Sequence, residues 1–143
     1  MRSRFEQQFS IGHRLIEETP TNFKRSGKLE ELIAKMKAIY CNAEYNQKIF
    51  CVLERHLTKN KKRTGRKGMD LWCIFVLSQI RLCLNTSYEW IHDLSNNHLS
   101  IRWLMGVETE YGFKRVEFSY QNIYDNVTLL SDEMVKEINC VFR

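Results

Sequence analysis

Proline and glycine are scarce in this sequence, with one proline and six glycines among 143 residues. Collagen-like chains need glycine at every third position, and low-complexity disordered chains are commonly rich in both residues, so both classes are excluded. Hydrophobic residues make up 43% of the chain and charged residues 27%, a balance typical of a folded, largely helical protein. The length predicts a single domain with a substantial core.

Long hydrophobic runs are also missing. The most apolar stretch, residues 69–84, has 12 apolar residues in 16, but Asp70, Gln79 and Arg81 interrupt it. A helix that crosses a bilayer needs about 20 consecutive apolar residues, so this stretch is too short. We therefore predict a buried helix in a protein that does not enter a membrane.

Cysteine is present, but not in a spacing that predicts a disulfide framework or a zinc site. The five cysteines are an odd number without a close pair, and no secretory signal is visible, so we expect reduced thiols in the cytoplasm. Neither a Cys-x-x-Cys nor a His-x-x-x-His spacing occurs. Cys73 and Cys83 lie in the apolar stretch and are predicted to be small core residues.

Acidic residues are too scattered to predict a metal-dependent active site. Such a site needs two or three carboxylates that meet at one point. Phosphate-binding glycine loops, nucleophile elbows and Cys/His catalytic patterns are absent as well. We therefore expect no metal, no other cofactor and no enzymatic activity. The acids considered are Asp70, Asp93, Asp125, Asp132 and Glu133.

Apolar residues recur at helical spacing along most of the chain, which predicts an all-α, multi-helix domain. The pattern is most regular over residues 29–57, where it predicts one long helix or two helices with a bend near Asn42. Residues 1–27 contain the sole proline, Pro20, and are predicted to form an N-terminal arm, or a short helix, and a linker. Residues 28–143 are predicted to form the helical domain.

Two predicted helices, over 69–84 and 87–94, are joined by a short turn and give the domain a helix-turn-helix-like core. Units of this kind commonly place one helix in a DNA groove. The second helix exposes side chains that would repel phosphates, so we favour a packing role for it over DNA readout. These side chains are Glu89, His92 and Asp93.

Serine and glycine residues mark the ends of several predicted helices. Ser87 is an N-cap candidate for the second helix of the pair, and Gly106 is suited to end a third, short helix. Residues 107–118 are predicted to form either a loop or a small hairpin. Two further helices are predicted, one from Ser119 onward and one that follows an N-cap at Ser131.

The net charge of +5 comes from a single stretch. Seven cations and no acid lie between Arg55 and Lys67, whereas the rest of the chain has 15 bases and 17 acids. Residues 58–68 have no apolar side chain and are predicted to form an exposed basic loop. Such a loop can follow a phosphate backbone and release its counterions, so we predict DNA contact, with a solvated surface loop as the alternative. The predicted phosphate contacts are Lys59, Lys61, Lys62, Arg63, Arg66 and Lys67, with Arg81 and Arg102 as weaker candidates.

A longer stretch resembles a known family. The run GRKGMDLWCIFVLSQIRLCLNTSYEWIHDLSNNHLSIRWLMGVE, residues 65–108, is similar to the N-terminal domain of bacterial insertion-sequence transposases of the DDE type. That domain has an apolar helix, a Ser-capped helix and a short helix closing on a Leu-x-Gly signature, which resemble residues 75–84, 87–94 and 102–106 here. The segments FSYQNIYDNVTLLSDEMVKEIN and MRSRFEQQFSIG also resemble this family, so the resemblance covers essentially the whole chain.

The resemblance implies a helical module that helps to bind the terminal inverted repeats of a transposon, which are double-stranded DNA, in the bacterial cytoplasm at the nucleoid. In this family the chemistry belongs to a downstream RNase-H-like domain with three metal-binding acids, and this chain ends before those motif positions. We therefore expect DNA binding without strand transfer, in a chain that has been truncated. Two alternatives stay open: a helical module for homodimerisation or assembly, and an inactive transposase remnant.

Overall fold

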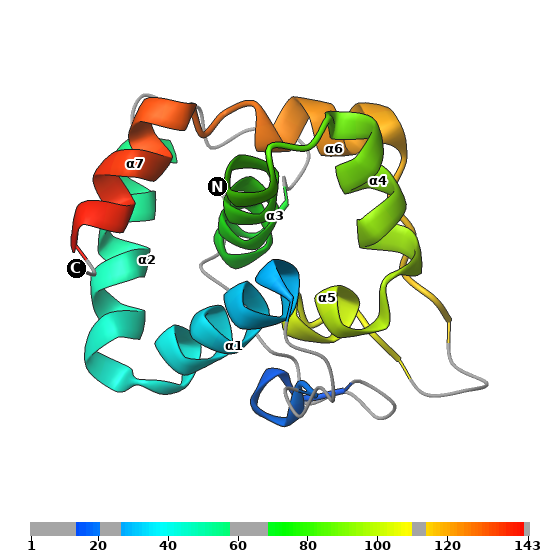
Figure 1. The fold of residues 1–143 in the computed structure, drawn as a ribbon, viewed down its shortest axis with the longest axis horizontal. Helices are drawn as coiled ribbons and strands as arrows, with labels where there is room; N and C mark the ends of the chain where they lie inside the picture. Colours follow the sequence, from blue (N-terminus) through cyan, green and yellow to red (C-terminus); the bar gives the residue numbers. More distant parts are fainter. Residues whose placement is uncertain (1–13, 21–26, 58–68, 110–113, 142–143) are drawn as a thin grey trace.

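A computed structural model describes residues 14–20, 27–57, 69–109 and 114–141 (Figure 1). Every regular element within these ranges is a helix, so the predicted all-α class is confirmed. A short 3-10 helix and seven α-helices follow one another in these parts of the chain. They are η1 (Ile16–Glu18), α1 (Lys28–Cys41), α2 (Ala43–Leu57), α3 (Leu71–Leu84), α4 (Tyr88–Asn97), α5 (Leu99–Leu104), α6 (Tyr120–Val127) and α7 (Asp132–Val141).

Helix α3 is the centre of the fold. Figure 1 shows it in the middle of the molecule with the other α-helices arranged around it, and it contacts α1, α2, α4, α6 and α7. Its first ten residues, Leu71 to Ile80, are all buried. A helix enclosed on nearly every side has no need of a polar face, which explains the almost continuous apolar sequence. The predicted burial of this stretch is confirmed for Leu71 to Ile80, whereas residues 81–84, with Cys83 among them, are only partly buried.

An aromatic cluster packs α3 against the first two α-helices. The Trp72 ring is fully buried, and its centroid lies 4.9 Å from that of Tyr40, 5.5 Å from that of Phe75 and 6.3 Å from that of Phe50. The rings are tilted against one another, as aromatic pairs prefer. The indole Nε1 of Trp72 donates to the carbonyl oxygen of Leu104 at 2.8 Å, so the polar end of the ring is paired. We call these four rings the Trp72 cluster.

The amphipathic segment 29–57 forms two helices, and Asn42 is where they separate. Its ψ of 116° is extended, so the backbone of α1 cannot continue through it. Its Oδ1 accepts a hydrogen bond from the backbone N–H of Tyr45 at 3.1 Å, which satisfies a free donor in the first turn of α2. Of the two arrangements that the sequence allowed, the bend at Asn42 is therefore the one that forms.

Three serines cap helices as N-cap chemistry predicts. The Oγ of Ser87 accepts from the N–H of Trp90 at 3.3 Å, and Ser119 and Ser131 do the same for α6 and α7, at 3.1 and 3.3 Å. The predicted starts of these helices are confirmed. The turn before Ser87 depends on Asn85, which takes the left-handed conformation with a φ of 51°.

The short helix α5 begins at Leu99, and its N-cap is His98. The Nδ1 of His98 accepts from the N–H of Ile101 at 3.3 Å. Burial lowers the pKa of His98, which keeps Nδ1 free to accept. Gly106 follows the helix with a φ of 75°, the left-handed position for which glycine was expected.

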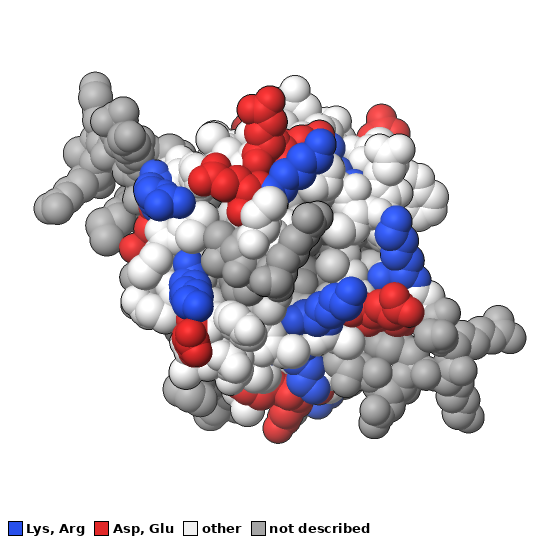
Figure 2. Space-filling model, turned by 60° about the vertical axis from the view of Figure 1, so that its left-hand side comes forward, with Lys and Arg blue, Asp and Glu red and all other residues white. Residues whose placement is uncertain are grey.

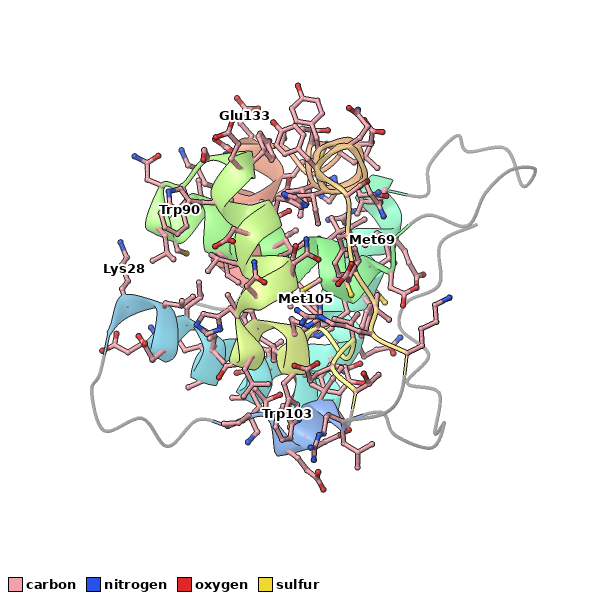
Figure 3. All side chains as sticks on the ribbon, turned by 90° about the vertical axis from the view of Figure 1, so that its right-hand side faces the viewer. Lys28, Met69, Trp90, Trp103, Met105 and Glu133 are labelled. Atoms are coloured by element: carbon pink, nitrogen blue, oxygen red, sulfur yellow. The ribbon has the colours of Figure 1, made fainter. Side chains whose placement is uncertain are left out.

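The described part of the predicted arm and linker, residues 14–20, packs on the helical domain. Ile16 and Thr19 are buried, and η1 contacts α1 and α5. The Leu15 carbonyl accepts from the indole Nε1 of Trp103 at 2.6 Å, and Figure 3 shows Trp103 beside η1. Of the arm and the short helix that the sequence left open before the linker, the described residues contain a short helix, and it packs on the domain. Sequence periodicity did not predict the position of this short helix, because three residues are too few to show a helical pattern.

Candidate nucleic-acid interface

The basic loop predicted over residues 58–68 lies outside the described residues, together with six of its predicted phosphate contacts. The structure describes the residues on either side of this segment. Leu57, the last residue of α2, and Met69, just before α3, are both buried in the core. The backbone N–H of Met69 donates to Oδ1 of the buried Asn126 on α6 at 3.2 Å. The segment is therefore attached at both ends to the packed interior. The six residues are Lys59, Lys61, Lys62, Arg63, Arg66 and Lys67.

Arg55 is the cation of the stretch Arg55–Lys67 that the structure describes. It lies in the last turn of α2, where a positive charge is favourable near the negative end of the helix. Its side chain is 64% exposed, and Nη2 lies 3.8 Å from Oε1 of Glu137 on α7. The neighbouring His56 has Nε2 at 3.7 Å from the other carboxylate oxygen of Glu137. An exposed ion pair of this kind is weak and leaves Arg55 available to a phosphate.

Arg81, a weaker candidate, is occupied within the protein. Its guanidinium pairs with the carboxylate of Asp132 at the start of α7. It also lies over the ring of Tyr88, with Cζ 5.0 Å from the ring centroid. Sequence spacing gave no sign of either contact, because they join α3 to α4 and α7. Its contact with phosphate stays a prediction.

Arg102 is a structural residue, so its prediction as a phosphate contact is wrong. Its side chain is 1% exposed, and its guanidinium donates to the carbonyls of Ser95 at 2.9 Å and Val116 at 2.7 Å. Nε lies 3.6 Å from the carboxylate of Glu108. Desolvation lowers the pKa of Arg102, opposed by the charge of Glu108. A buried guanidinium with these partners holds the chain after α5 against α4 and cannot reach DNA.

Helix α4, the second helix of the turn motif, is a packing helix. It contacts α3, α5 and α6. His92, expected to be exposed, is partly buried, and its Nε2 lies at hydrogen-bond distance, 2.8 Å, from the carbonyl oxygen of Phe118. The exposed residues of α4 include two acids, which repel a phosphate backbone. The packing role that the sequence favoured is in keeping with these contacts. The exposed residues are Glu89, Trp90, Asp93 and Asn97.

The described surface does not supply a second basic patch on the face formed by α2 and α7. Figure 2 shows that Lys and Arg side chains on this face alternate with Asp and Glu side chains. Lys48 and Glu44, for example, form an exposed i,i+4 pair with Nζ 3.0 Å from Oε1. Mixed charges of this kind give no net attraction for a polyanion. The cation excess stays in the segment Arg55–Lys67.

Little among the described residues supports a metal site, a membrane-spanning helix or a reactive cysteine. No group of three or more His, Cys, Asp or Glu side chains in these ranges could hold a metal ion. No described helix is long and apolar enough to cross a membrane. The five cysteines are free thiols, and burial raises the pKa of the Cys73 thiol far above its usual value. Cys73 is therefore a core residue rather than a nucleophile.

Two residues near the basic segment were not found from the sequence. Asn126 lies 57 positions from Met69, and Glu137 lies far along the chain from Arg55. Helical periodicity marks Val127 as a core position but does not say which backbone group the amide of the preceding residue, Asn126, contacts.

Comparison of the chain with protein-family models, with curated proteins and with solved structures gives no match.

Proposed function

We propose that this chain is the DNA-binding module of a transposase-like protein and that it contacts the phosphates of transposon-end DNA through residues 58–68. The observation that carries the proposal is the run of seven cations without an acid between Arg55 and Lys67, in a chain that is otherwise slightly acidic. Phosphates attract such a run irrespective of base sequence, and counterion release drives the association. The resemblance of residues 65–108 to transposase N-terminal domains implies that this DNA is the end of a transposon.

The attachment of the segment supports this role. The residues on either side of it, Leu57 and Met69, are buried, and the backbone N–H of Met69 donates a hydrogen bond to Asn126. A segment tied at both ends to a packed core loses less conformational entropy on binding than a free tail of the same length. The proposal assigns phosphate contact to this segment and no base readout to α4. It assigns no strand transfer or other chemistry to the chain.

The proposal is tested by fluorescence anisotropy of a labelled duplex at several salt concentrations. If about four phosphates are neutralised, the logarithm of the affinity falls with the logarithm of salt at a slope near −3.6. In the variant K61Q/K62Q/R63Q/R66Q the affinity should collapse and the slope should approach zero. A wild-type affinity that does not change with salt would refute phosphate contact as the basis of binding.

A matched control removes the same amount of charge from elsewhere on the surface. Lys28, Lys35, Lys114 and Lys136 are all exposed and lie outside the segment. The variant K28Q/K35Q/K114Q/K136Q should keep most of the affinity and nearly all of the salt slope. Equal losses in the two variants would mean that net charge, rather than the segment, determines binding, and the assignment to residues 58–68 would be wrong.

A further inference from the structure

A second aromatic cluster lies on the surface, where α4 and α6 meet. The ring centroids of Tyr88 and Tyr124 are 5.2 Å apart, those of Tyr120 and Tyr124 are 6.2 Å apart, and those of His92 and Tyr120 are 6.1 Å apart. Tyr120 is 40% exposed and Tyr124 is 44% exposed. We call Tyr88, His92, Tyr120 and Tyr124 the tyrosine face. The rings of Tyr120 and Tyr124 are exposed to solvent and stacked on each other.

The helices that carry the tyrosine face, and the start of α7, also carry acidic residues. Glu89 follows Tyr88 on α4, and Asp125 follows Tyr124 on α6, and both are exposed. The start of α7 adds Asp132 and Glu133, and Figure 3 shows Glu133 at the same end of the molecule as α6. Exposed π faces beside carboxylates form a surface that attracts cations and repels phosphates. Nucleic acid is therefore a poor occupant.

The protein already contains one example of the contact that this surface can make. The guanidinium of Arg81 lies over Tyr88, 5.0 Å from the ring centroid, and pairs with Asp132. Tyr120 and Tyr124 present the same ring type, and their exposed surface leaves room for further guanidinium or ammonium groups. Asp125, the next residue after Tyr124, is exposed, and its Oδ1 accepts a hydrogen bond from Gln121 at 2.7 Å. The surface is thus complementary to a chain segment rich in arginine and lysine.

We propose that the tyrosine face binds the cation-rich segment Arg55–Lys67 of a second copy of this chain. The choice of occupant rests on charge complementarity: this segment holds seven cations without an acid, and the rest of the chain is slightly acidic. The contact joins two different surfaces, so it is heterologous, and a copy that lacks one surface can still use the other. The proposal does not depend on DNA binding, although both would use the same cations.

The experiment is sedimentation velocity at low and high ionic strength, with variants that remove one surface each. The wild type should associate at low salt and dissociate at high salt, because exposed charge pairs are screened. E89Q/D125N removes the acids that follow Tyr88 and Tyr124 and keeps the rings, and should weaken association about 3- to 10-fold. K61Q/K62Q/R63Q/R66Q should weaken it at least as much. The control E31Q/E44Q, which removes two exposed acids on α1 and α2, should associate like the wild type.

Mixing the two defective variants gives the decisive result. At a protein concentration close to the wild-type dissociation constant, each variant alone should be mainly monomeric. An equimolar mixture should form a dimer, because E89Q/D125N supplies an intact basic segment and the other variant supplies an intact tyrosine face. A mixture as monomeric as its parts would overturn the proposal. Association that survives in both variants would overturn it as well, since another surface would then be responsible.

A ring variant and a DNA measurement separate this inference from the proposed function. Y120S/Y124S should weaken association, by about 2- to 5-fold for each cation–ring contact that is lost. The same variant and E89Q/D125N should bind duplex DNA at least as tightly as the wild type in the anisotropy measurement. Loss of DNA affinity in these variants would make the tyrosine face a nucleic-acid surface and would refute the inference. A wild type that binds DNA but stays monomeric at every concentration would refute the inference alone.

Discussion

The Trp72 cluster and the tyrosine face consist of the same kind of residue in opposite surroundings. Tyr40, Phe50 and Phe75 pack around a fully buried Trp72 between α1, α2 and α3. The rings of the tyrosine face join α4 to α6 at the surface, where Tyr88 and His92 are partly buried and Tyr120 and Tyr124 are exposed. Aromatic content therefore does not say where a ring will lie. Position relative to the central helix α3 decides it, because Trp72 and Phe75 on α3 and Phe50 on α2 are buried in the core, whereas Tyr120 and Tyr124 lie on the outer side of α6.

This comparison separates residues that hold the fold from residues that are free to meet a partner. Loss of a ring in the Trp72 cluster should cost stability, whereas loss of a ring in the tyrosine face should cost stability little and association much.

The largest effect is expected for Trp72→Ala. It removes a fully buried ring and leaves a cavity among Tyr40, Phe50 and Phe75, which should lower the free energy of unfolding by about 3–5 kcal/mol. Because a domain of this kind has about 5–15 kcal/mol in total, the variant should be close to unfolding at 37 °C. Urea denaturation followed by circular dichroism measures the loss.

Trp72→Phe is the companion variant. It keeps most of the ring and removes the N–H that pairs with the Leu104 carbonyl, so it should cost about 1–2 kcal/mol. If the two substitutions cost the same, the hydrogen bond rather than the packing would dominate, and the contrast between the two aromatic clusters would fail.

The second largest effect is expected for Arg102→Met. The substitution leaves the buried carbonyls of Ser95 and Val116 without their donor and Glu108 without its cation, and should cost about 2–4 kcal/mol. At a temperature where the variant is folded, its affinity for duplex DNA should equal that of the wild type. A salt slope lowered by about one unit in the folded variant would return Arg102 to the phosphate contacts.

A smaller effect is expected from the pH dependence at His98. Burial lowers its pKa below the usual value of 6.5, although Glu30 acts in the opposite direction. The folded state therefore binds fewer protons than the unfolded state, so this contribution to stability is complete above pH 6.5 and is lost as the pH falls towards the folded pKa. His98→Asn keeps an N-cap acceptor that does not titrate. The stability difference between wild type and variant should shift against the wild type between pH 7 and pH 5, and a difference that does not change with pH would contradict this.

The smallest effect is expected for Tyr124→Ser. Its ring is 44% exposed, and the substitution removes an edge contact with Tyr88 and a stacked contact with Tyr120, so stability should fall by about 0.5–1.5 kcal/mol. Thermal denaturation gives this value. A loss as large as that of Trp72→Ala would show that the tyrosine face holds the fold, and it would then not be a surface kept for a partner.

Much of the fold was predictable from local patterns. The serine N-caps, the left-handed Gly106 and the largely apolar α3 follow from chemistry that acts over a few residues, and the structure confirms them. The position of the break in the segment 29–57 was suspected at Asn42 but not decided, because a helical pattern continues across it. For the predicted interface, the cation-rich segment was visible in the sequence, and Arg102 was misassigned because exposure is not a local property.

The sequence by itself determined that the chain is helical, where most helices begin and end, and that its positive charge lies between Arg55 and Lys67. These properties depend on side chains within one or two turns of one another. Only the tertiary structure decided that η1 belongs to the core, that Arg102 is enclosed and that Tyr120 and Tyr124 are exposed. The reason is that burial depends on which helices pack together, and that packing brings into contact residues as far apart as Leu15 and Trp103.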